Sequence, residues 1–279
     1  MKRNNQGFHL LAIVLVVTVV GAVGLVGWKV ASKKDKATPS AANSSQSSNG
    51  GTSSDVTWAF LDTWQPSSTP PACEDPISFD TPTPNLDKAT AVLYPGQFRS
   101  TGYKTHGGFL FGDSNNGDIS VTVPRDGHLI FGSRYIEQGD VQYFFVFSSP
   151  CGIIWRFDHL LTLSPKFQAI ADKLPTAKVD DSRTTNLTPP VSVKKGEVVA
   201  TAVGFKTNKN VGFDFGVYDV RSKNEVSRNA DWSTLHASDQ EFAPYGVCWF
   251  DLLGAKDSVS VKSLPAGDGA SGKTSDYCK

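Results

Sequence analysis

An excess of charge of either sign is missing from this sequence of 279 residues, in which 27 Lys and Arg balance 27 Asp and Glu. General nucleic-acid binding needs surplus positive charge, so we expect no nucleic-acid partner. The sequence also has no Gly-x-Ser-x-Gly elbow and no His-Glu-x-x-His motif. These absences argue against a serine hydrolase of the elbow type and against a helix-borne zinc protease site.

Cysteine is scarce, with four residues and no Cys-x-x-Cys pair, which argues against a zinc ribbon. An even number of cysteines beyond an apolar segment indicates two disulfide bonds made in an oxidising compartment. Four cysteines allow three pairings. We favour Cys248–Cys278, which would pin the C-terminal tail, and this choice leaves Cys73–Cys151. Four buried free thiols are the alternative.

Long apolar runs are missing except for one, from Phe8 to Val30. A helix of this length, at about 1.5 Å per residue, can cross a hydrocarbon core about 30 Å thick. We therefore expect residues 1–31 to form a transmembrane anchor; a cleavable signal peptide, the alternative, would have a shorter apolar region. Lysines lie on both sides of the run, so the positive-inside rule does not orient it. The cysteines and the linker favour a single-pass protein of the cell membrane with its globular part outside the cytoplasm.

Large apolar residues are missing from residues 32–55, where Ser, Asn, Gly and Ala dominate. Such a segment cannot bury enough surface to fold, so we expect a disordered linker. Beyond it we expect a segment rich in Pro, Ser and Thr that wraps the globular body over residues 56–93. A β domain should follow over residues 94–222, and a disulfide-pinned tail over residues 223–279.

The body has the two-residue hydrophobic period of half-buried strands, as in Ile119, Val121 and Val123, which alternate with Ser120 and Thr122. Further strands are predicted at 141–147, 153–163, 191–193, 198–205 and 211–220. A single short helix is predicted over residues 164–174, where Ser164 can cap the helix and Pro165 suits its first position. No βαβ alternation is present, so the expected fold is mainly β: an antiparallel barrel or sandwich with one short helix, beyond the N-terminal transmembrane helix.

The extreme N-terminus resembles that of type IV pilins and pseudopilins. Lys2 and Arg3 are followed by Gly7-Phe8 directly before the apolar run. In that family the leader is cut between Gly and Phe, and a glutamate stands five residues into the mature chain. Ala12 occupies that position here. The resemblance implies a pilin-like assembly subunit as one alternative function.

Several motifs of the body follow one another in a characteristic order. They are His106-Gly-Gly-Phe-Leu-Phe111, Val123-Pro-Arg-Asp-Gly-His-Leu-Ile130, Phe157-Asp-His-Leu160, Val193-Lys-Lys-Gly-Glu-Val-Val199 and Gly212-Phe-Asp-Phe-Gly-Val217. Together they resemble the M23 (lysostaphin-like) metallopeptidase domain with its duplicated hybrid β-barrel motif. The resemblance covers residues 94 to 222 and implies that fold.

The resemblance also assigns roles to single residues. M23 enzymes hold Zn²⁺ with two His and one Asp and leave a position open for water. His106 occupies the place of the first ligand and Asp214 that of the last, where a carboxylate could still bind metal. The Asp between them is replaced by Leu110, and one catalytic His is replaced by Gly212. His159 matches the other catalytic His. Simple hydrogen-bonded or packed side chains are the alternative interpretation of His106, His159 and Asp214.

Because the implied metal triad is incomplete, we expect no cofactor, with Zn²⁺ as the possible exception. The expected function is that of a membrane-anchored extracytoplasmic protein with an M23-like fold that has lost catalysis. Its partner would be cell wall, glycan or a cell-surface protein. One alternative is a divergent zinc-dependent peptidoglycan endopeptidase that uses His106, Asp214 and, for catalysis, His159. The pilin-like subunit is the other alternative.

Overall fold

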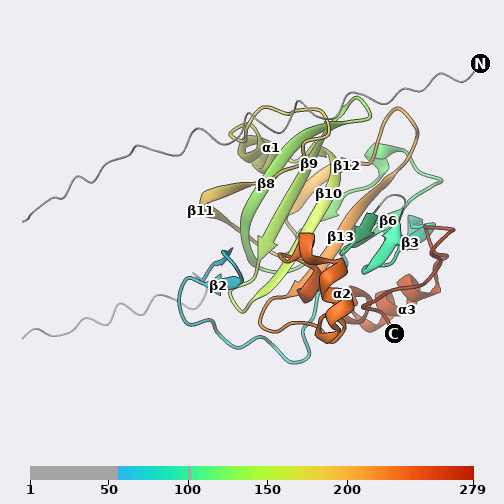
Figure 1. The fold of residues 1–279 in the computed structure, drawn as a ribbon. Helices are drawn as coiled ribbons and strands as arrows, with labels where there is room; N and C mark the ends of the chain where they lie inside the picture. The colour runs from blue at the N-terminus through green and yellow to red at the C-terminus, as the bar shows by residue number, and fades with distance from the viewer. Residues whose placement is uncertain (1–55, 100–101) are drawn as a thin grey trace, which may run out of the picture. The chain divides into compact units, whose positions relative to one another are not determined.

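A computed structural model describes residues 56–99 and 102–279, which form a mainly β, antiparallel body with short helices (Figure 1). The expected anchor (1–31), the linker (32–55) and the pilin-like start lie outside the described residues. Within the described part of the chain, no helix is both long enough and apolar enough to span a bilayer.

The strands are short in the N-terminal third and long in the centre of the chain. They are β1 (Trp58–Phe60), β2 (Trp64–Pro66), β3 (Ala91–Leu93), β4 (Gln97–Arg99), β5 (Gly102–Lys104), β6 (Gly107–Leu110), β7 (Val121–Thr122), β8 (Gly127–Glu137), β9 (Asp140–Ser148), β10 (Ile153–Leu163), β11 (Thr185–Val193), β12 (Val198–Val203) and β13 (Gly212–Asp219). The α-helices are α1 (Pro165–Ala171), α2 (Ala230–Leu235) and α3 (Ala255–Ser263).

One large sheet dominates the body, in the order β11-β8-β9-β10-β13-β6-β3, with β12 paired to β10 and β7 paired in turn to β12. Figure 1 shows β8, β9, β10 and β13 running side by side across the molecule. Strand β10 is central, because its first part lies between β9 and β13 while its last part, from Leu160, pairs with β12. All of these pairings are antiparallel.

The expected barrel does not close. Among the described strands, β11 and β3 stand at opposite ends of the order, and neither pairs with the other. Strand β11 contains Pro189 and Pro190, which have no backbone N–H to donate to a further strand. This composition suits an edge strand and explains why the sheet stays open on that side.

The expectation of one helix is also wrong, because the described residues contain three. Helix α1 confirms the predicted one: Pro165 is at its first turn, and Phe167 and Ile170 are buried. Ser164 stands at the N-cap but makes no side-chain capping hydrogen bond. Helix α2 has only six residues and α3 buries only Val261, so neither presents an apolar stripe that the sequence pattern reveals.

The large sheet has an apolar core on one face and a mixed aromatic and polar layer on the other. In β10, Trp155 and Phe157 point into the apolar core with Phe147, Phe215 and Trp249. The intervening residues of β10 face Phe144, Tyr218 and Phe242 on the opposite side. This opposite face carries the candidate functional residues.

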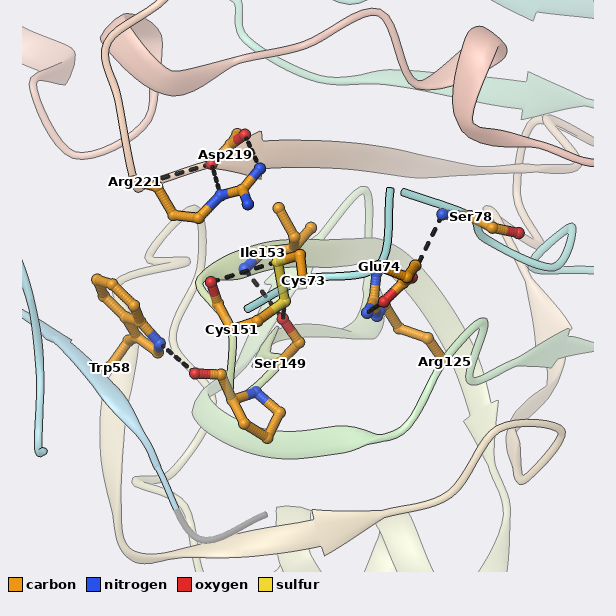
Figure 2. The surroundings of a disulfide bond; sticks show 11 residues. Trp58, Cys73, Glu74, Ser78, Arg125, Ser149, Cys151, Ile153, Asp219 and Arg221 are labelled. Carbon is orange, nitrogen blue, oxygen red and sulfur yellow. Dashed lines mark hydrogen bonds and ion pairs between the residues drawn. A yellow bond between two sulfur atoms is a disulfide. The ribbon is translucent and has the colours of Figure 1, made fainter. Parts of the chain in front are cut away.

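Both predicted disulfide bonds are present, Cys73–Cys151 and Cys248–Cys278, and all four cysteines are paired. The alternative of free thiols is therefore wrong. Figure 2 shows the first bond beside the turn that joins β9 to β10, where Trp58 donates a hydrogen bond to Pro150 O. The second bond holds the C-terminal residues against a stretch whose Trp249 and Phe250 are buried in the apolar core.

Candidate functional site

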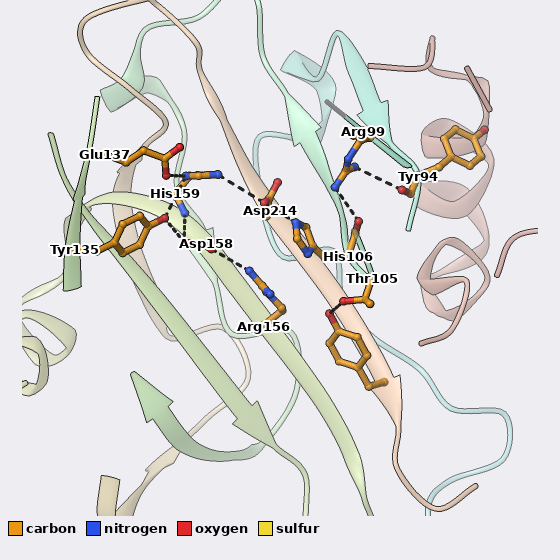
Figure 3. A network of polar contacts seen from close by, with 11 residues as sticks. Tyr94, Arg99, Thr105, His106, Tyr135, Glu137, Arg156, Asp158, His159 and Asp214 are labelled. Atoms are coloured by element: carbon orange, nitrogen blue, oxygen red, sulfur yellow. Dashed lines mark hydrogen bonds and ion pairs between the residues drawn. The ribbon is translucent and has the colours of Figure 1, made fainter. Parts of the chain in front are cut away.

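His106 and Asp214 come together because β6 and β13 are paired. Gly108 lies opposite Asp214 in the register, and His106 directly precedes β6. A Cβ atom at Gly108 would lie 2.6 Å from Phe213 O, so glycine permits the close approach of the two strands. The imidazole Nε2 of His106 lies 2.8 Å from Asp214 Oδ2, within hydrogen-bond distance (Figure 3).

His159 reaches the same carboxylate through an irregularity in β10. The register shifts between Phe157 and Leu160, and His159 has a φ of 59°. The backbone N–H of His159 donates to Asp158 Oδ1 at 2.9 Å, which holds this bulge. As a result His159 Nε2 lies 3.6 Å from Asp214 Oδ2, while its Nδ1 lies 3.9 Å from Glu137 Oε2. Left-handed backbone at a residue other than glycine is concentrated at functional and specially constrained positions.

The structure thus brings together the three site residues named from the motifs, with Asp214 between the two imidazoles (Figure 3). It also adds residues that the motifs do not include. Tyr135 donates a hydrogen bond to Asp158 Oδ1 at 2.7 Å, and Arg156 Nη2 pairs with Asp158 Oδ2 at 2.9 Å.

The alternation of Arg156 and Asp158 with Trp155 and Phe157 along β10 is the pattern that could have identified these additional residues. Charged side chains that alternate with buried aromatic ones must lie together on one face of a strand. The Arg156 guanidinium also lies over the Phe144 ring, 4.0 Å from its centroid. Its place on the sheet face is therefore fixed from two sides.

Arg99 and Thr105 complete the surroundings of His106. Arg99 Nη2 donates to the backbone carbonyl of His106 at 2.9 Å, and the hydroxyls of Thr105 and Tyr218 lie 3.1 Å apart. All four of these side chains are buried. The result is one continuous polar cluster, from Glu137 and Tyr135 at one end to Arg99 at the other, which we call the His106–Asp214 cluster.

Burial lowers the pKa of His106 from its ordinary 6.5 to about 4, although Asp214 acts in the opposite sense. The imidazole is therefore neutral at neutral pH and donates its Nε2 proton to Asp214. Its Nδ1 atom is buried and has no hydrogen-bond partner among the described residues. For Asp214, burial raises the pKa, but His106, His159 and Arg99 outweigh burial and hold it below its ordinary value. The carboxyl is thus ionised.

The donor set does not fit the zinc site that the M23 resemblance implies. Leu110 stands where an acidic ligand is needed, and it lies opposite Gly212 in the register. A Cβ atom at Gly212 would lie 2.8 Å from Leu110 Cδ2, so an apolar side chain fills the space of the missing histidine. Across residues 56–99 and 102–279, no group of three or more His, Cys, Asp or Glu side chains is arranged to hold a metal ion.

A second chemical motif lies elsewhere, at Gly267–Thr274, which reads Gly-x-x-x-x-Gly-Lys-Thr. This is the spacing of a phosphate-binding loop, in which a strand precedes the glycines and a helix follows them. Here no helix follows, and Asp268 Oδ1 already accepts the backbone N–H groups of Ala270 and Ser271. The context therefore does not fit a phosphate loop.

No protein-family model, no curated protein and no solved structure matches this chain. The similarity to M23 metallopeptidases therefore remains a resemblance of sequence motifs, and the similarity to pilins remains one of the first residues.

Proposed function

We propose that this protein is a non-catalytic, M23-like binding protein of the cell envelope. The observation that carries the proposal is the packing of Leu110 onto Gly212, at the two positions where an active site of this kind needs Asp and His. An aliphatic side chain offers no metal ligand and no proton. Because Leu110 fills the space beside Gly212, the pairing supports a structural role for these two positions in place of a catalytic one.

Most of the remaining charged groups pair with one another. Asp214 accepts from His106, and Asp158 is shared by Tyr135 and Arg156. Buried charges are tolerated when they are paired and hydrogen-bonded, and such clusters stabilise one arrangement of a fold. We therefore assign the His106–Asp214 cluster a structural role that holds β6, β10 and β13 together.

The chain after β13 also covers part of the sheet face that carries the cluster. The Phe242 ring lies 4.7 Å from that of Tyr218, and Trp64 donates a hydrogen bond to Glu241 O at 2.7 Å. Figure 1 shows α2 in front of the sheet beside β13. A long polymeric substrate would need this face open, so the covering favours binding elsewhere on the molecule.

A partly exposed aromatic cluster, Phe98, Tyr103 and Trp232, provides a surface suited to binding. Phe98 is 55% exposed, and its ring lies 5.6 Å from Tyr103. The side chains of Tyr103 and Trp232 both donate to Asp276 Oδ2, at 2.8 and 2.7 Å. Aromatic rings with polar edges suit sugars and peptide side chains. The proposed partners are therefore peptidoglycan, another glycan or a cell-surface protein.

The proposed setting is the outer side of the cell membrane, with residues 1–31 as a single-pass anchor and residues 32–55 as its tether. The two disulfide bonds support an oxidising compartment.

A divergent zinc-dependent endopeptidase is the second candidate. The observation that favours it is the approach of two imidazoles to one carboxylate oxygen, at 2.8 Å for His106 and 3.6 Å for His159. In that function His106 and Asp214 would hold the metal, and His159 would serve in catalysis at the position of the family's other catalytic histidine. Zinc content separates the two candidates.

Co-sedimentation of the detergent-solubilised full-length protein with purified peptidoglycan tests the binding proposal. We expect the protein to pellet with the wall and to release no soluble wall fragments. Phe98→Ala should reduce the pelleted fraction, whereas Leu61→Ala, which truncates another exposed apolar side chain, should leave it unchanged. Equal pelleting of both variants would contradict the role of the aromatic cluster. Absence of pelleting by the wild type would reject wall binding.

A further inference from the structure

A polar pocket of about 340 Å³ lies between β8, the first residue of β11 and the segment that connects α1 to β11. Its charged lining residues are Arg134, Lys178, Asp181 and Arg183, and its hydroxyl-bearing lining residues are Ser133, Thr176, Thr184 and Thr185. Pro175 is the one apolar residue among the described residues that line it. A lining of this kind does not suit an apolar ligand.

The pocket has a surplus of positive charge although the whole chain has none. Three cationic side chains and one carboxylate line it, which leaves two net positive charges. Arg183 holds the Asp181 carboxylate with two hydrogen bonds, from Nε at 2.7 Å and from Nη2 at 2.6 Å. Asp181 therefore neutralises Arg183, while the charges of Arg134 and Lys178 are left to attract an anion.

Arg134 is held in position for such a role. Its Nε donates to Pro175 O at 2.8 Å, and this bond fixes the plane of the guanidinium group. The two Nη groups take no part in the bond. A fixed guanidinium fork matches the geometry of phosphate and carboxylate oxygens. The neighbouring threonine hydroxyls can donate to the same oxygens or bond the hydroxyls of a sugar.

This pocket is separate from the His106–Asp214 cluster. Arg134 and Tyr135 are consecutive residues of β8, and successive side chains of a strand point to opposite faces. Tyr135 bonds to Asp158 within the cluster, so Arg134 points away from it.

We propose that this pocket binds an oxyanion, a phosphate or a carboxylate, carried by a sugar or polyol. The inference goes beyond the proposed function, because it depends neither on wall binding nor on the state of the His106–Asp214 cluster. A volume of about 340 Å³ holds one charged sugar unit, at the lower end of the range for small-ligand pockets, about 300–1,000 Å³.

Isothermal titration calorimetry of the detergent-solubilised full-length protein tests the inference, with glucose 6-phosphate, glucuronate and uncharged glucose as probes. Arg134→Gln removes one of the two cations that attract the anion, and Arg183→Gln leaves the Asp181 carboxylate unpaired, so that it repels an anion. Each substitution should weaken binding of the charged probes about tenfold or more, the usual scale of a lost charged hydrogen bond. Arg221→Gln is the matched control, because Arg221 forms the same two-bond fork with a carboxylate two residues earlier, Asp219, outside the pocket (Figure 2). It should bind as the wild type does. Lys273→Gln, in the Gly267–Thr274 segment, should also leave binding unchanged.

Tighter binding of glucose 6-phosphate than of glucuronate would support a phosphorylated ligand, and the reverse order a carboxylated one. Raising the salt concentration should weaken binding of both, because the pocket is open to solvent. Thermal unfolding of each variant confirms that it is folded. Should Arg134→Gln fail to fold, Lys178→Gln, on a connecting segment, replaces it with the same expectation. Absence of binding by the wild type, equal binding of glucose, or equal loss in Arg183→Gln and Arg221→Gln would overturn the inference.

Discussion

Leu110 of β6 lies opposite Gly212 of β13, and its Cδ2 atom is 2.8 Å from the position that a Cβ atom on residue 212 would take. The two residues therefore depend on each other, since the leucine occupies the space that the glycine leaves. In the M23 resemblance these are the positions of an acidic ligand and a catalytic histidine. Replacing Gly212 alone by His would place the new side chain against Leu110. Replacing Leu110 alone by Asp would leave position 212 without an imidazole.

Gly212→Ala should destabilise the protein by about 1–3 kcal/mol, the usual cost of overpacking a close contact. The added methyl group would meet both Leu110 Cδ2 and the Phe109 carbonyl oxygen at 2.8 Å. Gly254→Ala is the control, because a Cβ atom there meets nothing within 4 Å. Urea unfolding of the three proteins measures the effect. Equal unfolding free energies for the two variants would contradict the packing described.

His106→Ala should cost about 3 kcal/mol of unfolding free energy, because it leaves the buried Asp214 carboxylate without its main hydrogen-bond donor. The control is Lys194→Ala, which breaks an exposed ion pair with Asp126 and should cost less than about 1 kcal/mol. A double-mutant cycle with Asp214→Asn measures the coupling directly. Additive effects of the two cluster substitutions would reject the structural role assigned to this pair.

Acidification should weaken the fold through His106. Its pKa is about 4 in the folded protein and takes the ordinary value of 6.5 when the chain unfolds. Between these two pH values the unfolded chain binds the proton and the folded protein does not, so stability falls as the pH drops from about 6.5 to about 4. The loss should be about 2–3 kcal/mol at the lower end of this window.

Urea unfolding at several pH values checks this dependence against His106→Gln, which keeps a side-chain donor but does not titrate. The variant should show the shallower slope over the same window. Identical slopes for the two proteins would show that His106 is not buried as a neutral imidazole.

Glu241→Gln should stabilise the protein at alkaline pH. Burial, with Asp239 nearby, raises the pKa of Glu241 to about 7 from an ordinary 4.5. Since the folded-state pKa is the higher one, the glutamate disfavours folding increasingly as the pH rises from 4.5 through 7. We expect a gain of about 1–3 kcal/mol at pH 8 and almost none at pH 4.

Thermal unfolding at the two pH values measures the gain, with the exposed Glu225→Gln as the control. A gain at both pH values, or at neither, would contradict the burial of a titrating carboxyl at position 241.

Much of the fold could be predicted from the sequence, because its long strands have clear hydrophobic periods. The apolar pattern of residues 153–163 predicts a strand, and these residues form β10; the favoured one of the three possible cysteine pairings is the one present. The open sheet could not be predicted in the same way. Whether the last strand reaches the first depends on distant pairings and on edge residues such as Pro189 and Pro190.

The candidate site was partly accessible from sequence. The motifs named His106, Asp214 and His159, and the structure places them together. The motifs do not identify Tyr135 and Arg156, because a single aromatic or charged residue is common in a strand. Their contacts depend on the register of β8, β9 and β10 and on the bulge at His159, neither of which the hydrophobic pattern specifies.

The metal content of the detergent-solubilised full-length protein, measured by elemental analysis beside His106→Ala, tests the central claim most directly. If the His106–Asp214 cluster is structural, both proteins should carry far less than one zinc per chain, and added zinc should release no peptidoglycan fragments from cell wall. One zinc per wild-type chain that is lost in His106→Ala, together with release of wall fragments, would contradict the account and establish the zinc peptidase instead.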